Sequence, residues 1–69
     1  MRVAVLTISD AGAAGTRLDR SGETIVEWVS TVPGGVVAAR AVVPDESVEI
    51  VRVLLAWCDG DVADLVLTT

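Results

Sequence analysis

The first apolar run of the chain predicts a buried strand. Residues 3–8 are almost continuously apolar and rich in β-branched side chains, and the run stops at Ser9 and Asp10. A strand that does not alternate apolar with polar residues is usually covered on both faces, as in a parallel sheet flanked by helices. We therefore expect a central strand over residues 2–10, with ligand-binding residues just beyond its carboxyl end.

A loop and an amphipathic helix are predicted next. Residues 11–18 are mostly small and carry two glycines, in a spacing that fits neither G-x-G-x-x-G nor the Walker A loop. Asp19 or Ser21 is a suitable N-cap for the helix that follows, and Pro33-Gly34-Gly35 ends it. Helical spacing predicts an apolar face made of Ile25, Val26, Trp28, Val29 and Val32.

A second strand and a second helix follow. Residues 36–43 form an apolar run interrupted only by Arg40, and the segment Pro44-Asp45-Glu46-Ser47 breaks it. Asp45 or Ser47 is the expected N-cap of the helix. Its apolar face is expected to comprise Val48, Val51, Leu54 or Leu55, and a buried Cys58, with Ile50 and Trp57 at the margins.

The order of these elements predicts the fold class. Residues 63–69 form a third apolar run, which completes the order β-α-β-α-β with short connections. Right-handed crossovers then place the first strand between the other two in a parallel sheet. The prediction is an α/β fold, a three-layer αβα arrangement of which these residues supply the first half.

Composition narrows the functional classes. The chain has 69 residues, 52% of them hydrophobic, which is a high share for one small domain and predicts a piece of a larger one. Ten acidic residues and five basic ones, all arginine, give a net charge of −5, so nucleic acid is not an expected partner. The absence of histidine excludes His-based catalysis within these residues. An anionic substrate remains possible through backbone N–H groups, an arginine or a carboxylate-held Mg²⁺.

A cytoplasmic location is expected. Cys58 is the single cysteine, so no internal disulfide forms and a reducing compartment is the default. The first residues do not fit a signal peptide, and no apolar run approaches the ~20 residues that a membrane helix needs.

Several motifs, taken together, resemble one family. In chain order they are Ser9-Asp10 after the first strand, Asp19-Arg20-Ser21-Gly22, Val43-Pro44-Asp45-Glu46, Trp57-Cys58-Asp59 and the final Leu67-Thr68-Thr69. This series closely resembles the N-terminal part of the molybdopterin-binding family, which includes bacterial MogA and MoaB proteins and the G domain of gephyrin-like proteins. The resemblance covers essentially the whole chain.

The resemblance implies a function and partners. It implies molybdenum cofactor biosynthesis by adenylylation of molybdopterin with Mg²⁺ and ATP, in a homotrimer, with a molybdenum-insertion domain as a possible partner. In the family, the strand ending Leu-Thr-Thr runs into a Gly-Gly-Thr-Gly phosphate loop and a second catalytic aspartate. Residues 1–69 hold neither, so we expect them to be the N-terminal portion of a single domain and not to catalyse alone.

The resemblance also implies roles for particular residues. Asp45 matches a catalytic carboxylate that would hold Mg²⁺ against nucleotide phosphates. Substrate-binding roles fall on Ser9, Asp10, Asp19, Ser21, Gly22, Thr68 and Thr69. From the residues alone, helix capping explains Asp45 and Asp19, and strand ends explain Ser9 and Thr69.

Two other functional classes remain open. One is a non-catalytic molybdopterin-binding or scaffold module of the gephyrin-like type, which would drive self-association. The other is a generic doubly wound domain, against which the missing G-x-G-x-x-G pattern argues. A long apolar third strand at the edge of the sheet also predicts association of the isolated chain.

Overall fold

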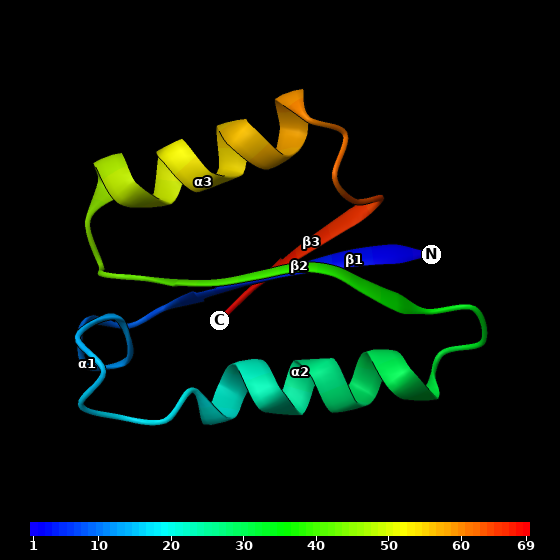
Figure 1. Ribbon diagram of the computed structural model, residues 1–69, viewed down its shortest axis with the longest axis horizontal. Helices are drawn as coiled ribbons and strands as arrows, with labels where there is room; N and C mark the ends of the chain where they lie inside the picture. The colour runs from blue at the N-terminus through cyan, green and yellow to red at the C-terminus, as the bar shows by residue number, and fades with distance from the viewer.

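A computed structural model describes all 69 residues and gives six elements in chain order (Figure 1). They are β1 (Arg2–Ile8), α1 (Asp10–Ala13), α2 (Arg20–Thr31), β2 (Val36–Val43), α3 (Ser47–Asp59) and β3 (Leu65–Thr68). No helix among them has the length and apolar character needed to cross a bilayer.

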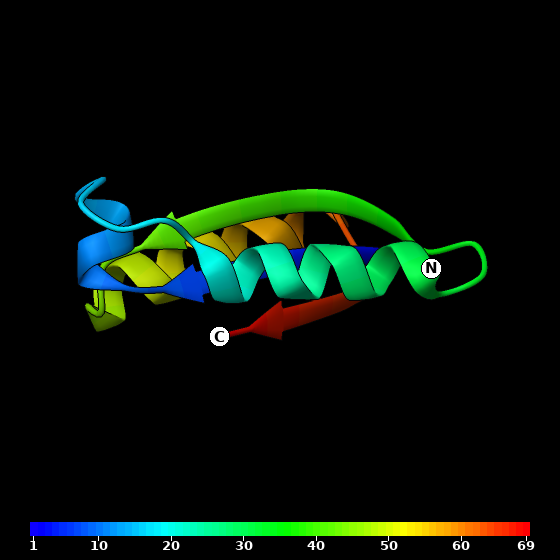
Figure 2. The ribbon, with the colours of Figure 1, turned by 90° about the horizontal axis from the view of Figure 1, so that it is seen from below.

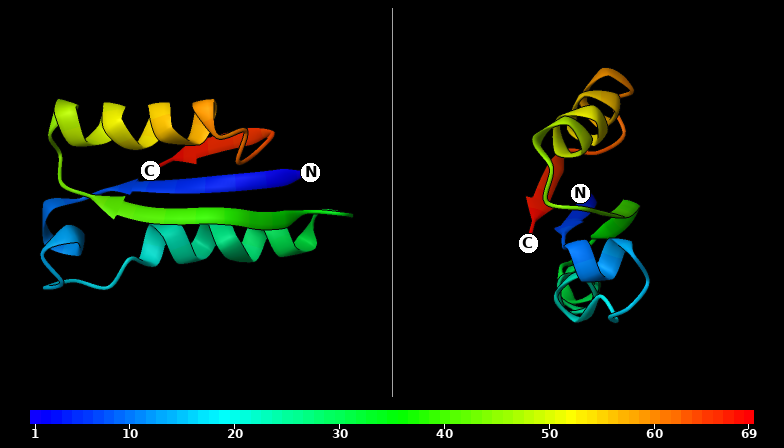
Figure 3. Two further views of the ribbon diagram at one scale, coloured as in Figure 1. Left: turned by 45° about the horizontal axis from the view of Figure 1, so that its top comes forward. Right: turned by 90° about the vertical axis from the view of Figure 1, so that its left-hand side faces the viewer.

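The sheet has the predicted order and direction. Its three strands run parallel in the order β2-β1-β3, so β1 lies in the centre. Helix α2 covers one face of the sheet and α3 lies over the other (Figures 1 and 3). Figure 2, viewed from below, shows α2 running along the sheet with β3 at one edge. The predicted α/β class and the β-α-β-α-β layering are therefore confirmed.

The core is built on β1. Val3, Ala4, Val5 and Leu6 are all within 1% of complete burial, and Val29 of α2 packs against Val3 and Val5. This burial confirms that a continuous apolar run here marks the central strand. Since one strand supplies most of the buried side chains, stability depends on β1 being covered from both faces.

Two predicted boundaries were wrong. Strand β1 ends at Ile8, because Ser9 turns the chain into α1 and its Oγ accepts the Gly12 N–H at 3.0 Å. The first part of the predicted loop is therefore a short helix. Strand β3 begins only at Leu65, two residues later than predicted. Asp64 lies outside the strand, and its carboxylate accepts the Arg2 backbone N–H at 2.8 Å.

The predicted cap of α3 and most of its predicted apolar face were also wrong. Its N-cap is Glu46, whose side chain makes no capping hydrogen bond, and not Asp45 or Ser47. The half-buried apolar side chains are those of Ile50, Val53, Leu54 and Trp57, whereas Val48, Val51, Leu55 and Cys58 are exposed. Because α3 is apolar around most of its circumference, helical spacing alone could not identify the side that faces the sheet.

Candidate functional site

The carboxyl ends of all three strands meet at one edge of the sheet. The Ser9 N–H donates to the Val43 carbonyl at the end of β2, at 2.8 Å. On the other side, the Ile8 N–H donates to the Thr69 carbonyl after β3, also at 2.8 Å. This parallel register gathers the segments that carry most of the predicted site residues.

One hydrogen bond joins two of the predicted aspartates. The Asp45 N–H donates to Asp10 Oδ1 at 2.9 Å, which connects the start of α1 to the loop between β2 and α3. Both residues are exposed, and neither carboxylate takes part in an ion pair. We call Asp10 and Asp45 the acidic edge. Since its backbone contact leaves the Asp45 carboxylate free, that carboxylate is available to a ligand.

The Asp19 carboxylate accepts three hydrogen bonds. Its Oδ1 accepts the Gly22 N–H at 3.0 Å, which makes it the N-cap of α2 in place of Ser21. Its Oδ2 accepts the Thr7 hydroxyl and an Arg40 Nη2–H, each at 3.0 Å. The carboxylate thereby connects β1, β2 and α2.

These contacts decide the charge of Asp19. Burial of the carboxyl group acts to raise its pKa, but hydrogen bonds from Arg40, the Gly22 N–H and Thr7 outweigh burial and lower the pKa below its ordinary value. The hydrogen bond to Glu23, followed by the one to Asp19, raises the pKa of Arg40. Asp19 therefore stays ionised near neutral pH and has a structural role in this site.

Asp19 leaves no room for a side chain at Gly22. Gly22 is buried, and a Cβ added to it would overlap Oδ2 of Asp19 and lie 2.7 Å from its Cγ. No side chain fits here unless the carboxylate leaves Thr7 and Arg40. Packing against Asp19 thus explains why position 22 is glycine, and the substrate-binding role of Gly22 stays a prediction.

We expect Gly22→Ala to destabilise the fold by about 1–2 kcal/mol, although alanine is favoured over glycine in helices by about 1 kcal/mol. The added methyl group would push the Asp19 carboxylate off its partners. Urea unfolding followed by circular dichroism measures the change. In an Asp19→Ala background the same substitution should be neutral or stabilising, and a loss of the same size there would contradict this explanation.

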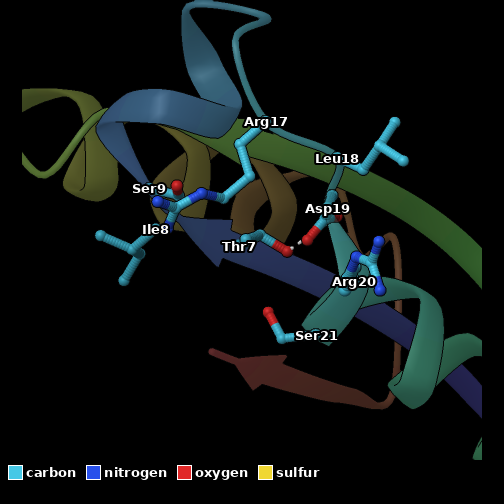
Figure 4. Close-up of a pocket in the computed structure, with 8 residues that line it drawn as sticks. All are labelled: Thr7, Ile8, Ser9, Arg17, Leu18, Asp19, Arg20 and Ser21. Atoms are coloured by element: carbon cyan, nitrogen blue, oxygen red, sulfur yellow. Dashed lines mark hydrogen bonds between the residues drawn. The ribbon is translucent and has the colours of Figure 1, made fainter.

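A cavity of about 500 Å³ opens beside this cluster, between the end of β1 and the start of α2 (Figure 4). Its lining comprises Thr7, Ile8, Ser9, Arg17, Leu18, Asp19, Arg20 and Ser21. The Ser21 hydroxyl points into the space between β1 and α2, and the Arg17 side chain reaches across to Ser9 (Figure 4). The cavity is polar and can receive a ligand that bears charge.

The structure thus divides the predicted site residues into groups. Ser9, Asp19 and Ser21 line the cavity, whereas Asp10 and Asp45 form the acidic edge. Thr68 and Thr69 end the neighbouring strand and Gly22 lies behind Asp19. Sequence reasoning missed Thr7, Arg17, Arg20 and Arg40. The two arginines that flank Asp19 in the sequence were the available signal for a basic side of the cavity.

The acidic edge limits what metal the chain can hold. No group of three or more His, Cys, Asp or Glu side chains gathers anywhere in the structure. A complete protein cage for Zn²⁺ or Ca²⁺ is therefore not formed by this chain. Mg²⁺ typically takes only one or two carboxylates and completes its shell with water and phosphate oxygens, so the carboxylate oxygens of the acidic edge suit it.

These features define a class, an α/β domain with a polar cavity at the carboxyl edge of a parallel sheet. Residues 4–69 match the family described as a probable molybdopterin binding domain, and the chain belongs to this family. It is 38% identical over 68 residues to a molybdenum cofactor biosynthesis bifunctional protein of Chlorobaculum tepidum, covering 99% of the chain and 21% of that protein. It is 38% identical over 65 residues to a molybdopterin adenylyltransferase of Pyrococcus furiosus, covering 94% of the chain and 37% of that protein. The chain thus spans well under half the length of either relative.

Proposed function

We propose that this chain forms the first part of a molybdopterin-binding site. We further propose that, within a polypeptide that carries the whole domain, it contributes to adenylylation of molybdopterin by Mg²⁺ and ATP. The names of the relatives support the substrate and the reaction class. The observation that carries the proposal is the hydrogen bond between Asp10 and Asp45, which brings two carboxylates from distant segments to the carboxyl edge of the sheet.

Each residue of the proposed site has a distinct role. Asp45 supplies the carboxylate that holds Mg²⁺, while Asp10 fixes the Asp45 backbone and adds a second nearby carboxylate. Bound Mg²⁺ would neutralise phosphate charge during transfer of the adenylyl group. Ser9 and Ser21 supply hydroxyl groups to the substrate in the cavity. Thr68 and Thr69 take part from the neighbouring strand end.

Titration of the chain with molybdopterin tests the binding proposal. We expect saturable binding, measured by calorimetry. A polypeptide with the whole domain should in addition release pyrophosphate from ATP when molybdopterin and Mg²⁺ are present. Failure of both the chain and the longer polypeptide to bind molybdopterin would overturn the proposal. Binding without pyrophosphate release would favour the non-catalytic, gephyrin-like alternative.

A self-association role is supported by α3. Val48, Val51 and Leu55 are 76%, 50% and 56% exposed and line up along one side of the helix. Apolar rows of this kind are often covered by a partner surface. We propose that α3 helps to assemble a homotrimer of the whole domain, in the cytoplasm.

Leu55→Glu should shift the mass of the assembled species toward the monomer in light scattering, because it places a charge in the proposed contact. Ala56→Glu, which introduces the same charge at an exposed position on another side of α3, is the matched control and should leave the mass unchanged. Equal behaviour of the two variants would contradict an apolar contact through α3.

A further inference from the structure

The five arginines of the chain fall into two groups. Arg2, Arg40 and Arg52 form ion pairs with carboxylates at distances from 2.6 to 3.6 Å. Arg17 and Arg20 form none, and their guanidinium groups donate no hydrogen bond within the chain. Both line the same cavity at the end of β1, and their guanidinium groups lie on opposite sides of it (Figure 4). We call them the arginine pair.

The cavity around this pair carries a local excess of positive charge. The only acidic residue in its lining is Asp19, whose carboxylate is already bound to Arg40, Thr7 and the Gly22 N–H. The rest of the lining is neutral. Arg20 also lines an adjoining cavity with Glu23 and Glu27, but neither glutamate forms an ion pair with it, and Glu23 is already paired with Arg40. Both guanidinium groups are therefore free to bind an anion, in a chain whose net charge is −5. The cavity therefore favours an anion over any other ligand.

Neutral donors in the same cavity suit an oxyanion. The Ser21 hydroxyl points into the space between β1 and α2 (Figure 4). The Ser21 N–H lies in the first turn of α2, where backbone donors have no partner within the helix. Arginine binds phosphate through parallel N–H donors, and serine and backbone N–H groups complete such sites.

We propose that the arginine pair binds a phosphate group of the substrate. The proposal rests on the proposed function for the identity of the ligand, since molybdopterin and ATP both carry phosphate, and it assigns the binding of that group to Arg17 and Arg20. The acidic edge would hold Mg²⁺ at the same edge of the sheet. One ligand could thus place a phosphate group against the arginine pair while a second group binds a metal ion held by Asp45.

Inorganic phosphate is the first probe. Titration of the chain, followed by ¹⁵N–¹H NMR of the Ser21 amide and the arginine Nε–H groups, should give saturable shifts that weaken with added salt. The double variant Arg17→Gln/Arg20→Gln should weaken phosphate binding about tenfold or more. Arg52→Gln removes one unit of positive charge from exposed α3, as each single variant of the pair does at the cavity, and should change the affinity less than about twofold. Absence of saturable binding, or an equal loss in Arg52→Gln, would overturn the proposal.

A loss of phosphate binding in the double variant would not be due to unfolding. Both side chains of the pair are exposed and make no hydrogen bond in the chain, so the double variant should unfold at the same urea concentration as the parent. Each single variant, Arg17→Gln and Arg20→Gln, then shows how the affinity is shared between the two sides of the cavity.

A second set of titrations identifies the source of the phosphate. If the double variant loses affinity for molybdopterin but not for its dephosphorylated form, the pair binds the pterin phosphate. If it loses affinity for ATP instead, the pair binds a nucleotide phosphate. Unchanged affinity for both would overturn the proposal while leaving the proposed function intact. If the chain binds phosphate through the arginine pair, but neither the chain nor a polypeptide with the whole domain binds molybdopterin, the phosphate site stands and the proposed function fails.

Discussion

Asp19→Ala is expected to lower the free energy of unfolding by about 2–3 kcal/mol, a large share of the stability of so small a chain. The substitution removes the N-cap of α2 and the acceptor for Thr7 and Arg40 together. The Asp19 side chain is only 11% exposed, so water cannot replace these contacts freely. Urea unfolding measured by far-ultraviolet circular dichroism gives the change.

Glu27→Ala provides the matched control for this prediction. Glu27 is an exposed acidic residue on the same helix, and its carboxylate forms no ion pair. Its loss removes the same unit of charge and should change stability by no more than about 0.5 kcal/mol. Equal destabilisation by the two variants would mean that net charge, and not the Asp19 contacts, accounts for the effect.

The lowered pKa of Asp19 also predicts a pH dependence. The folded-state pKa lies below the unfolded value of about 3.9, so this carboxylate contributes its stabilisation above about pH 4. The contribution is lost as the pH falls through the folded-state pKa. Asp64, whose pKa is lowered mainly by hydrogen bonds from Arg2, adds to the same acid branch. Asp19→Asn should therefore flatten the fall in stability below pH 4 without abolishing it, and an unchanged curve would contradict the assignment.

Local sequence signals predicted the arrangement of elements. The uninterrupted apolar runs located β1 and β2, and the short connections required parallel strands with β1 in the centre. Residues 36–43 were predicted without error because a Gly-Gly pair and a proline bound that strand. The short helix α1 was missed because four residues are too few to show a helical repeat of apolar positions. Its one local signal is the N-cap residue Ser9.

The interactions across elements could not be read from local patterns. Asp19 and Arg40 are 21 positions apart in the chain, and their contact depends on how α2 packs against β2. The Asp10–Asp45 bond spans 35 positions and depends on the register of β1 and β2. The parallel pairing of β1 and β2 places both aspartates at the same edge, but it does not specify which backbone group joins them. Cys58 was expected to be buried and is exposed, because α3 offers apolar residues on nearly every side.

The largest functional effect is expected at Asp45. In a polypeptide that carries the whole domain, Asp45→Ala should reduce Mg²⁺-dependent adenylyl transfer by a factor on the order of 10³ or more, because the substitution removes the proposed metal ligand. Molybdopterin binding should remain largely intact. The fold should tolerate the change, since Asp45 meets Asp10 through its backbone N–H and its side chain is exposed.

Two neighbouring substitutions separate a metal-holding role from a structural one. Glu46→Ala removes an adjacent carboxylate that makes no capping bond, and it should leave transfer nearly unchanged. Asp10→Ala releases the Asp45 backbone and should cost an intermediate factor of about 10–100, as is typical when a residue that orients a metal ligand is lost. Raising the Mg²⁺ concentration should partly rescue Asp10→Ala but not Asp45→Ala, because only the first retains the proposed ligand. Full transfer activity in Asp45→Ala would reduce Asp45 to a loop residue held in place by Asp10.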